Sequence, residues 1–412
     1  MSEAYLLGGV RTPFARYGGS LSHLRLDDML ALVLNDVCRR VGVAPGDIED
    51  VIAGCVNPAH EGMGDLARWA ALAAGFPDTA AGATINRFCG SSLSATAMIA
   101  HAIKAGDLGI GIACGAESMS RSGWAYMKGD APFMPRGPQF MLDTMWSGAG
   151  GPPNPKLLSR NAYIGMIETA QNVADRYGLT REEIDAFALR SQRNARSARD
   201  RGRLAREITP VTIPATRKTP ERIVEHDEFI RDDTTAESLA ALPAQPGTTQ
   251  MTAGNSTPLS DGAAALILAS GERATDLGVV PLARIVSSAV YGNDPLLMGI
   301  APAWALPLAL RNAGLAPQQI DLWEIHEAFS AQALGVLREL PRQLNGFEIP
   351  DEKLTPNGGA VAIGHPFGAT GARYILTLAT EMRERGVRYG AVGVCIGSGQ
   401  GVAMVLENPD AS

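Results

Sequence analysis

Cys89 has the residue type and the position of a covalent nucleophile. It lies in residues 86–92 (NRFCGSS), at the end of a strand-like run and directly before a helix-like run of small residues. The free amides and partial positive charge of a helix N-terminus stabilise a thiolate, so we expect the pKa of this cysteine to be lowered. A buried cysteine at a strand end is also a common small apolar residue, so position alone leaves both interpretations open.

His365 occupies the same place in the second half of the chain. It lies in residues 364–371 (GHPFGATG), a turn that precedes another helix-like run. An imidazole beside a thiol can remove its proton, which is the usual way in which a cysteine nucleophile is activated. If the two halves pack face to face, we expect His365 and Cys89 to approach each other.

Two more residues with acid-base or hydrogen-bonding side chains end strand-like runs. Cys395 opens a loop whose residues 397–401 (GSGQG) let backbone amides approach a ligand closely. Its thiol could carry a proton and the amides could form an oxyanion hole. His326, in residues 325–329 (IHEAF), ends the other run. The alternatives are a structural cysteine beside a tight turn and a core or helix-cap histidine.

The helix-like and strand-like segments that position these residues occur twice in the sequence, as an internal repeat. Residues 26–56 show a helix-period apolar pattern, a stop at 42–45 (GVAP) and a short strand-like run ending near Cys55. Residues 302–328 repeat this plan, with the stop at 314–317 (GLAP). The second strand-like run ends at His326.

A second pair of segments follows in the same order. Residues 84–118 run strand, turn, helix, glycine and strand, and residues 357–401 supply the turn, the helix, the closing strand and a Gly-rich loop. Alternating helices and strands predict an α/β protein with largely parallel sheets covered by helices. Such units recur in any α/β protein, but the agreement of both pairs favours duplication into two pseudo-symmetric halves.

Residues between the halves differ in composition. Residues 121–160 are rich in Gly, Pro, Met and Trp and are predicted to be loop, whereas residues 163–206 show a helical pattern with Ile184, Phe187 and Leu189 inward. The arginines of this helical stretch are interpreted as a solvated face, with a phosphate-binding patch as the alternative. They are Arg190, Arg193, Arg196, Arg199, Arg201, Arg203 and Arg206.

We therefore predict three parts. These are an N-terminal half of residues 1–120 completed by 251–270, an inserted loop subdomain of residues 121–250, and a C-terminal half of residues 271–412. The insertion carries large apolar side chains that could line an acyl pocket or bury a subunit contact. They are Trp124, Met127, Phe133, Met134, Phe140, Met141, Met145 and Trp146.

The composition excludes several classes of protein. A net charge of −7 disfavours a nucleic-acid binder. Five cysteines scattered over 412 residues argue for free thiols in a reducing compartment. The start of the chain shows no signal-peptide pattern, and no apolar run reaches the roughly 18 residues of a membrane span. We expect a cytoplasmic protein without a membrane span and predict no metal site.

Together these segments resemble the thiolase family over essentially the whole chain, and within it the acetyl-CoA acyltransferases, or 3-ketoacyl-CoA thiolases, of the His-Glu-Ala-Phe type. The resemblance implies the thiolase fold, with two pseudo-symmetric halves in αβαβα layers. The matching motifs follow the family order: residues 11–14 (RTPF), Cys89 with its Ser-rich turn, residues 255–262, residues 326–329 (HEAF), residues 364–373 (GHPFGATGAR) and the Cys395 loop.

The resemblance also implies a mechanism in two steps. His365 takes the proton of Cys89, the thiolate attacks the 3-oxo carbon of a 3-oxoacyl-CoA, and Cys395 protonates the departing acetyl-CoA carbanion. Free CoA, a co-substrate and not a bound cofactor, then takes the acyl group; the reverse is a Claisen condensation. One oxyanion site would use the amides of Cys89 and Gly397, and the other His365 with His326. A histidine at 326 resembles the fatty-acid-degrading branch and favours β-oxidation.

For CoA binding, the resemblance implies Met166, Arg231 and Thr257. A guanidinium suits the adenine and phosphate end of CoA, although a surface ion pair is the alternative for Arg231. Ser92 and Ser398 stand where the family generally has glycine, and both add bulk near the reacting atoms. These departures keep open a catalytically weak thiolase-like protein that binds CoA or lipid or serves as an assembly subunit.

Other interpretations fit less well. A ketoacyl synthase has no place for Cys395, and a thiol redox enzyme would carry a Cys-x-x-Cys pair, which the chain lacks. The expected partners are acyl-CoA and CoA, with a homodimer or homotetramer as the assembly, and a hetero-complex with other β-oxidation enzymes stays open. Acyl chain length and the physiological direction are left undetermined.

Overall fold

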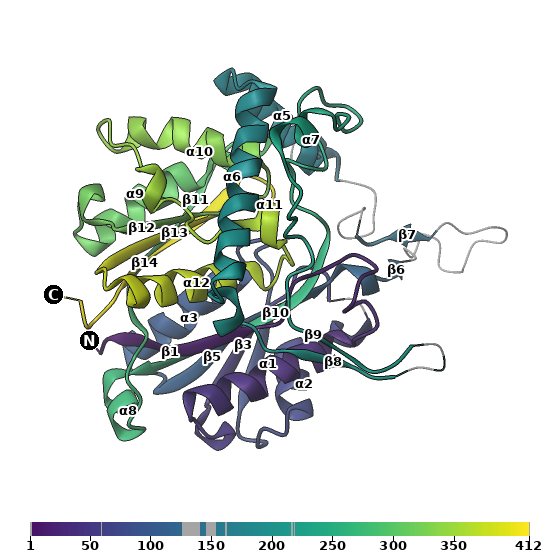
Figure 1. The fold of residues 1–412 in the computed structure, drawn as a ribbon. Coiled ribbons are helices and arrows are strands. Elements are labelled where there is room, and N and C mark those ends of the chain that lie inside the picture. Colours follow the sequence, from purple (N-terminus) through teal and green to yellow (C-terminus); the bar gives the residue numbers. More distant parts are fainter. Residues whose placement is uncertain are drawn as a thin grey trace.

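The computed structural model consists of two similar halves stacked in five layers (Figure 1). Two helices, α3 (Ser91–Ala105) and α12 (Thr370–Arg385), lie between two sheet regions, and further helices cover the outer faces. The layer order is therefore helix, sheet, helix, sheet, helix, which confirms the predicted fold. The structure describes residues 2–58, 60–125, 141–145, 154–160, 163–215, 217 and 219–411.

The first half is built from two separate stretches of the chain, residues 4–118 and residues 260–276. Its outer face is covered by α1 (Leu26–Val41) and α2 (Leu66–Ala73), with α8 (Gly271–Asp276) packed beside β1. Its strands are β1 (Ala4–Arg11), β2 (Ala15–Arg16), β3 (Asp50–Gly54), β4 (Ala81–Ile85), β5 (Ile110–Ser118) and β10 (Ser260–Ser270).

The second half repeats the plan with residues that are nearly contiguous. Helices α9 (Pro302–Ala313) and α10 (Ser330–Gln343) cover its outer face, and the short α11 (Ala360–Ile363) precedes the turn to α12. Its strands are β11 (Ala283–Gly292), β12 (Leu322–Ile325), β13 (Tyr389–Ile396) and β14 (Gln400–Glu407).

Both copies of the predicted repeat form the same elements. Helix α1 ends at Gly42, which has φ 80°, and is followed by a 3₁₀ turn at Pro45–Asp47 and by β3. Helix α9 ends at Gly314, which has φ 69°, and is followed by a 3₁₀ turn at Pro317–Gln319 and by β12. Glycine ends a helix in the left-handed conformation without steric cost, so the same residue stops both helices.

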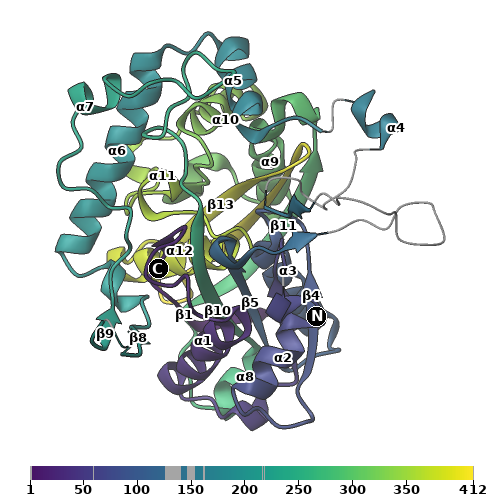
Figure 2. The same ribbon diagram turned by 90° about the vertical axis from the view of Figure 1, so that its right-hand side faces the viewer.

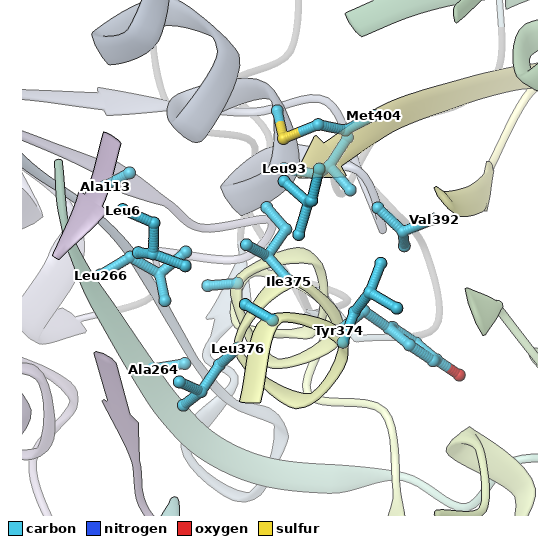
Figure 3. Packing of buried hydrophobic residues seen from close by; sticks show 14 of the residues in the cluster. Leu6, Leu93, Ala113, Ala264, Leu266, Tyr374, Ile375, Leu376, Val392 and Met404 are labelled. Atoms are coloured by element: carbon cyan, nitrogen blue, oxygen red, sulfur yellow. The ribbon is translucent and has the colours of Figure 1, made fainter. Parts of the chain in front are cut away.

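The central layer is the largest hydrophobic cluster, and α12 runs through its middle (Figure 3). Ile375 and Leu376 face β1 and β10 of the first half, while Tyr374 lies toward the second half. The surrounding side chains are buried: Leu6, Leu93, Ala113, Ala264, Leu266, Val392 and Met404. Because α12 packs on both sheet regions, the position of its first residues depends on how the halves come together.

The sheet is mixed, so the prediction of largely parallel sheets is wrong. Its strands follow the order β12-β13-β14-β11-β1-β10-β5-β3-β4, with β2 paired to β10. The pairs β3 with β4, β3 with β5, and β12 with β13 are parallel, and the others are antiparallel. For β13 and β14 the physical reason is connection length, since the tight turn between them permits only antiparallel pairing.

The segment between the halves contains two helices that pack against α10 of the second half (Figure 2). These are α5 (Met166–Tyr177) and α6 (Arg181–Asp200), and Ile184, Phe187 and Leu189 are buried as predicted. The smaller elements are β6 (Trp124–Ala125), β7 (Leu142–Asp143), α4 (Pro155–Leu158), β8 (Val211–Ile213), β9 (Arg222–Val224) and α7 (Ala236–Ala240).

One predicted surface arginine is in the core. Arg203 is 1% exposed and forms ion pairs with Glu207 and Glu381, so the prediction of a solvated face is wrong at this position. A buried guanidinium needs such carboxylate partners to offset its desolvation. The other six arginines keep part of their surface in solvent.

The apolar side chains predicted to line a pocket or a subunit contact are described only in part. Trp124 and Met141 are exposed, and Met145 is partly buried. Met127, Phe133, Met134, Phe140 and Trp146 lie outside the described residues. The division into residues 1–120 with 251–270, 121–250 and 271–412 stays a prediction.

Candidate active site

The turn that carries Cys89 has an uncommon backbone conformation that its own side chains hold. Phe88 has φ 44°, in the left-handed region that residues other than glycine rarely adopt. The Asn86 side chain accepts a hydrogen bond from the Phe88 amide at 2.8 Å, and the Ser91 hydroxyl donates to the Phe88 carbonyl at 2.6 Å. These bonds offset the strain and fix Cys89 directly before α3.

The Cys89 sulfur faces the loop between β13 and β14. The Gly397 amide is directed at this sulfur. Cys395 is fully buried near the end of β13, and the Ala328 amide is directed at its sulfur. Burial raises the pKa of Cys395, and a negative charge on Cys89 raises it further. Residues from both halves therefore meet around two neighbouring thiols.

The hydrogen bonds around His365 decide which of its ring nitrogens can accept a proton. Its backbone amide donates to the Ser260 hydroxyl at 3.0 Å, and its Nδ1 lies 2.6 Å from Thr370 Oγ1. The Thr370 hydroxyl donates its hydrogen to the Pro366 carbonyl at 2.9 Å. Oγ1 must then accept a hydrogen from Nδ1, which leaves Nε2 unprotonated. Nε2 is buried and has no partner within the described residues, as expected of a base awaiting its substrate.

His326 has the opposite arrangement. Its ring lies 4.3 Å from the His365 ring between centroids, and its Nδ1 is 3.4 Å from the Tyr374 hydroxyl. That hydroxyl accepts from the amides of Ala360 and Glu327, so its hydrogen is free for Nδ1. The proton of His326 is then on Nε2. His326 thus presents a hydrogen-bond donor where His365 presents an acceptor.

Burial determines the protonation states of Cys89 and His365 in the enzyme without substrate. Desolvation raises the pKa of Cys89 to about 12, and the Gly397 amide opposes this only in part. Desolvation also lowers the pKa of His365 to about 3, with a further contribution from the Arg373 guanidinium. The prediction of a lowered pKa for Cys89 is therefore wrong, because burial outweighs the helix terminus. At neutral pH the site holds a thiol and a neutral imidazole.

The two turns abut because the helices that follow them touch at their first residues. The Ser92 hydroxyl in α3 accepts a hydrogen bond from the Ala372 amide in α12 at 2.9 Å. A Cβ on Gly371 would lie 2.3 Å from the Leu93 nitrogen, so only glycine fits there. Ser92 thus joins the two helices, which explains one departure from the family pattern. Ser398, with φ 61°, is exposed in its turn.

The three predicted CoA residues lie in the segment between the halves and in the loop before β10. Met166 begins α5 and is 40% exposed. Thr257 donates from its amide to the Ala328 carbonyl and from its hydroxyl to the Ala360 carbonyl, both at 3.0 Å. Arg231 is exposed, and no carboxylate among the described residues forms an ion pair with it. The structure therefore offers no support for the surface ion pair considered for Arg231.

Sequence reasoning missed several residues that set the geometry of the site. Thr370, Tyr374 and Arg373 lie in or just after the GHPFGATGAR segment, and all three are buried. Their spacing from His365 was a usable signal, because residues at the start of a helix can contact the turn before it. Arg373 lies 3.8 Å over the Tyr374 ring and has no hydrogen-bond partner within the described residues.

Metal-binding clusters and membrane-spanning helices are both absent from the described residues. No cluster of three or more His, Cys, Asp or Glu side chains there could hold a metal ion. None of the helices there is long and apolar enough to span a membrane.

Comparisons with known proteins agree over the whole chain. Residues 4–272 match the family described as "Thiolase, N-terminal domain", and residues 279–408 match "Thiolase, C-terminal domain". The chain is 43% identical over 411 residues to the 3-oxoadipyl-CoA/3-oxo-5,6-dehydrosuberyl-CoA thiolase of Escherichia coli, covering 99% of this chain and 100% of that protein. It is 40% identical over 418 residues to the 3-ketoacyl-CoA thiolase of Bacillus subtilis, with the same coverage.

Solved structures show the same fold. The Bacillus anthracis acetyl-CoA acetyltransferase superimposes with a TM-score of 0.90 at 38% identity, covering 99% of both chains. The human mitochondrial 3-ketoacyl-CoA thiolase superimposes with a TM-score of 0.88 at 33% identity, also covering 99% of both chains.

Proposed function

Since this chain belongs to the thiolase family, we propose that Cys89, His365, Cys395 and His326 carry out its reaction. The enzyme is an acyltransferase that uses CoA to cleave a 3-oxoacyl-CoA into acetyl-CoA and a shortened acyl-CoA, or catalyses the reverse condensation. The observation that carries the residue assignment is the opposite hydrogen bonding of the two histidines, which provides one base and one donor.

The first step opens the carbon-carbon bond. His365 Nε2 takes the proton of Cys89 as the sulfur attacks the 3-oxo carbon, because the thiol is protonated in the resting enzyme. The amides of Cys89 and Gly397 hold the oxygen of the 3-oxo group as it gains negative charge. His326 Nε2–H holds the thioester oxygen of the departing acetyl-CoA, and Cys395 gives its proton to the carbanion.

The second step transfers the acyl group to CoA. The proton on His365 first moves to the Cys395 thiolate, which restores both groups. His365 then takes the thiol proton of the incoming CoA, whose sulfur attacks the acyl group on Cys89. Cys89 leaves as a thiolate and regains the proton from His365, so the cycle closes with no net gain or loss of protons.

The names of the relatives indicate which acyl groups to test first. The Escherichia coli relative acts on 3-oxoadipyl-CoA and the Bacillus subtilis relative on 3-ketoacyl-CoA. The proteins of Acinetobacter baylyi and Pseudomonas aeruginosa, 40% and 41% identical, are β-ketoadipyl-CoA thiolases. We propose a 3-oxoacyl-CoA with a terminal carboxylate as the preferred substrate.

A thiolysis panel tests both proposals. CoA is mixed with 3-oxoadipyl-CoA and with 3-oxoacyl-CoA esters of several lengths that end in a methyl group, and acetyl-CoA is measured for the wild type and for Cys89→Ala. We expect the highest kcat/KM with 3-oxoadipyl-CoA and a loss of at least about 10³-fold in the variant. Activity retained by Cys89→Ala would exclude this nucleophile, and a preference for the methyl-terminated esters would exclude the substrate proposal.

We further propose that the enzyme is a homodimer joined along β4. Among the described residues this strand ends the sheet and pairs only with β3, and none of its own residues is buried. Phe88, three residues after this strand, and Met98 on α3 are 41% and 46% exposed. An open strand edge with apolar neighbours is suited to pairing with a second copy.

The free thiols of Cys89 and Cys395 favour a reducing, cytoplasmic location.

A further inference from the structure

Glu117 joins the two halves of the molecule next to the active site. It lies near the end of β5 and is fully buried. Its carboxylate accepts three backbone hydrogen bonds, from Val56 at 3.0 Å, Asn57 at 2.9 Å and Gly368 at 2.9 Å. Val56 and Asn57 follow β3 in the first half, whereas Gly368 belongs to the turn that carries His365 in the second half.

The backbones around this carboxylate are in direct contact. A Cβ on Gly115 would lie 2.1 Å from the Gly368 carbonyl oxygen, and a Cβ on Gly368 would lie 2.4 Å from the Gly54 carbonyl oxygen. No side chain fits between the strands and the turn, so the turn cannot move closer to the first half. The Glu117 carboxylate holds it from moving away, because it binds the Gly368 amide.

We propose that Glu117 is a positioning residue for His365, holding the turn after the imidazole to the loop after β3 in the first half. This inference rests on the proposed role of His365 as the base. Ser260 binds the backbone amide of His365 at 3.0 Å, and Glu117 fixes the other end of the turn three residues later. The ring is thereby fixed relative to Cys89, which belongs to the same half as Glu117.

The charge of Glu117 is part of this function. An ionised carboxylate binds amide donors more strongly than a neutral acid does. Burial raises the pKa of Glu117 to about 7, although its three amide hydrogen bonds oppose the shift. The ionisable groups that face it are Cys55, Asp261 and Cys89, and the His365 turn contributes the Gly368 amide. The hydrogen bonds from the Val56, Asn57 and Gly368 amides to Glu117 are therefore strongest above neutral pH, and they weaken as Glu117 takes up a proton.

Glu117→Gln is the first test. The amide side chain has a similar size but only one acceptor oxygen, so it loses at least one of the three backbone bonds. We expect kcat of thiolysis to fall about 10- to 100-fold, with the KM for CoA changed less than about 2-fold, because the base is displaced and the CoA contacts are not. Asp36→Asn, a buried carboxylate on α1 that binds Thr209, is the matched control and should keep kcat.

The pH profile separates positioning from general stability. We expect kcat of the wild type to fall as the pH drops through about 7, and kcat of Glu117→Gln to be low without this step. Glu117→Asp keeps the charge but is shorter, so its kcat should be reduced while the step remains. This variant decides the matter if Glu117→Gln does not fold.

Three results would overturn the inference: wild-type kcat in Glu117→Gln, wild-type kcat in Glu117→Asp, or an unchanged pH step in Glu117→Gln. Activity in His365→Ala and Cys89→Ala is measured in parallel. If these two variants are inactive and Glu117→Gln is active, only the positioning role of Glu117 is rejected. If His365→Ala and Cys89→Ala retain activity, the proposed function is rejected.

Discussion

At the scale of single residues, Thr370 determines the tautomer of His365. Thr370→Val removes the acceptor for Nδ1–H at nearly constant volume, so the proton can occupy Nε2 and block it as a base. We expect kcat to fall about 10- to 100-fold, within the range of lost acid-base catalysis. Thr370→Ser keeps the hydroxyl and should retain most activity, as measured by steady-state thiolysis. Equal rates for the Val and Ser variants would contradict the assigned tautomer.

The raised pKa of Cys89 has a measurable consequence in the enzyme without substrate. A group with pKa about 12 is protonated at neutral pH and loses its proton only as the pH rises. We expect the rate of iodoacetamide labelling at Cys89 to increase about tenfold per unit between pH 7 and pH 10. Peptide mass mapping measures it. A rate that levels off below pH 8 would show a thiolate at neutral pH.

Access still makes Cys89 the most reactive thiol. The other four cysteines are buried, whereas Cys89 is only partly buried. We therefore expect iodoacetamide to modify Cys89 before the other four cysteines, with exposure as the reason and not a lowered pKa. Cys395 serves as the internal control because it is fully buried.

At the scale of elements, the contact between β5 and the His365 turn depends on glycine. Gly115→Ala would place a Cβ 2.1 Å from the Gly368 carbonyl oxygen, so the turn or the strand must shift. We expect the free energy of unfolding to fall by about 1–3 kcal/mol, as in other overpacked cores, and thiolysis to decrease. Gly46→Ala, where nothing lies within 4 Å of the added Cβ, should leave both unchanged in denaturant titration. Stability equal to that of the wild type in Gly115→Ala would refute the tight packing.

At the scale of the whole molecule, the dimer along β4 can be broken by one charge. Met98 lies on α3 and is 46% exposed, and if the proposed contact covers it, Met98→Glu would bury a carboxylate there. We expect light scattering to give the mass of a dimer for the wild type and of a monomer for the variant at low micromolar concentration. Val280→Glu is the control, since Val280 is 67% exposed and precedes β11. A dimeric Met98→Glu would place the contact elsewhere.

The sequence by itself determined the duplicated plan and the residue types at the candidate site. Helix and strand periods, Gly42 and Gly314 as helix ends, and the positions of Cys89 and His365 before two helices are local features. Local features can be predicted because the forces that fix them act between residues near in sequence. The motifs in order likewise indicated the family, which the comparisons confirmed.

Only the tertiary structure decided the mixed strand order of the sheet, the burial of Arg203, and the pKa of Cys89. It also supplied the partners that fix both histidines and the carboxylate of Glu117 between the halves. Each depends on desolvation or on hydrogen bonds between residues far apart in the chain, and neither can be calculated before the halves are placed. Composition and spacing name the reacting groups, but the packing of the two halves sets their protonation and orientation.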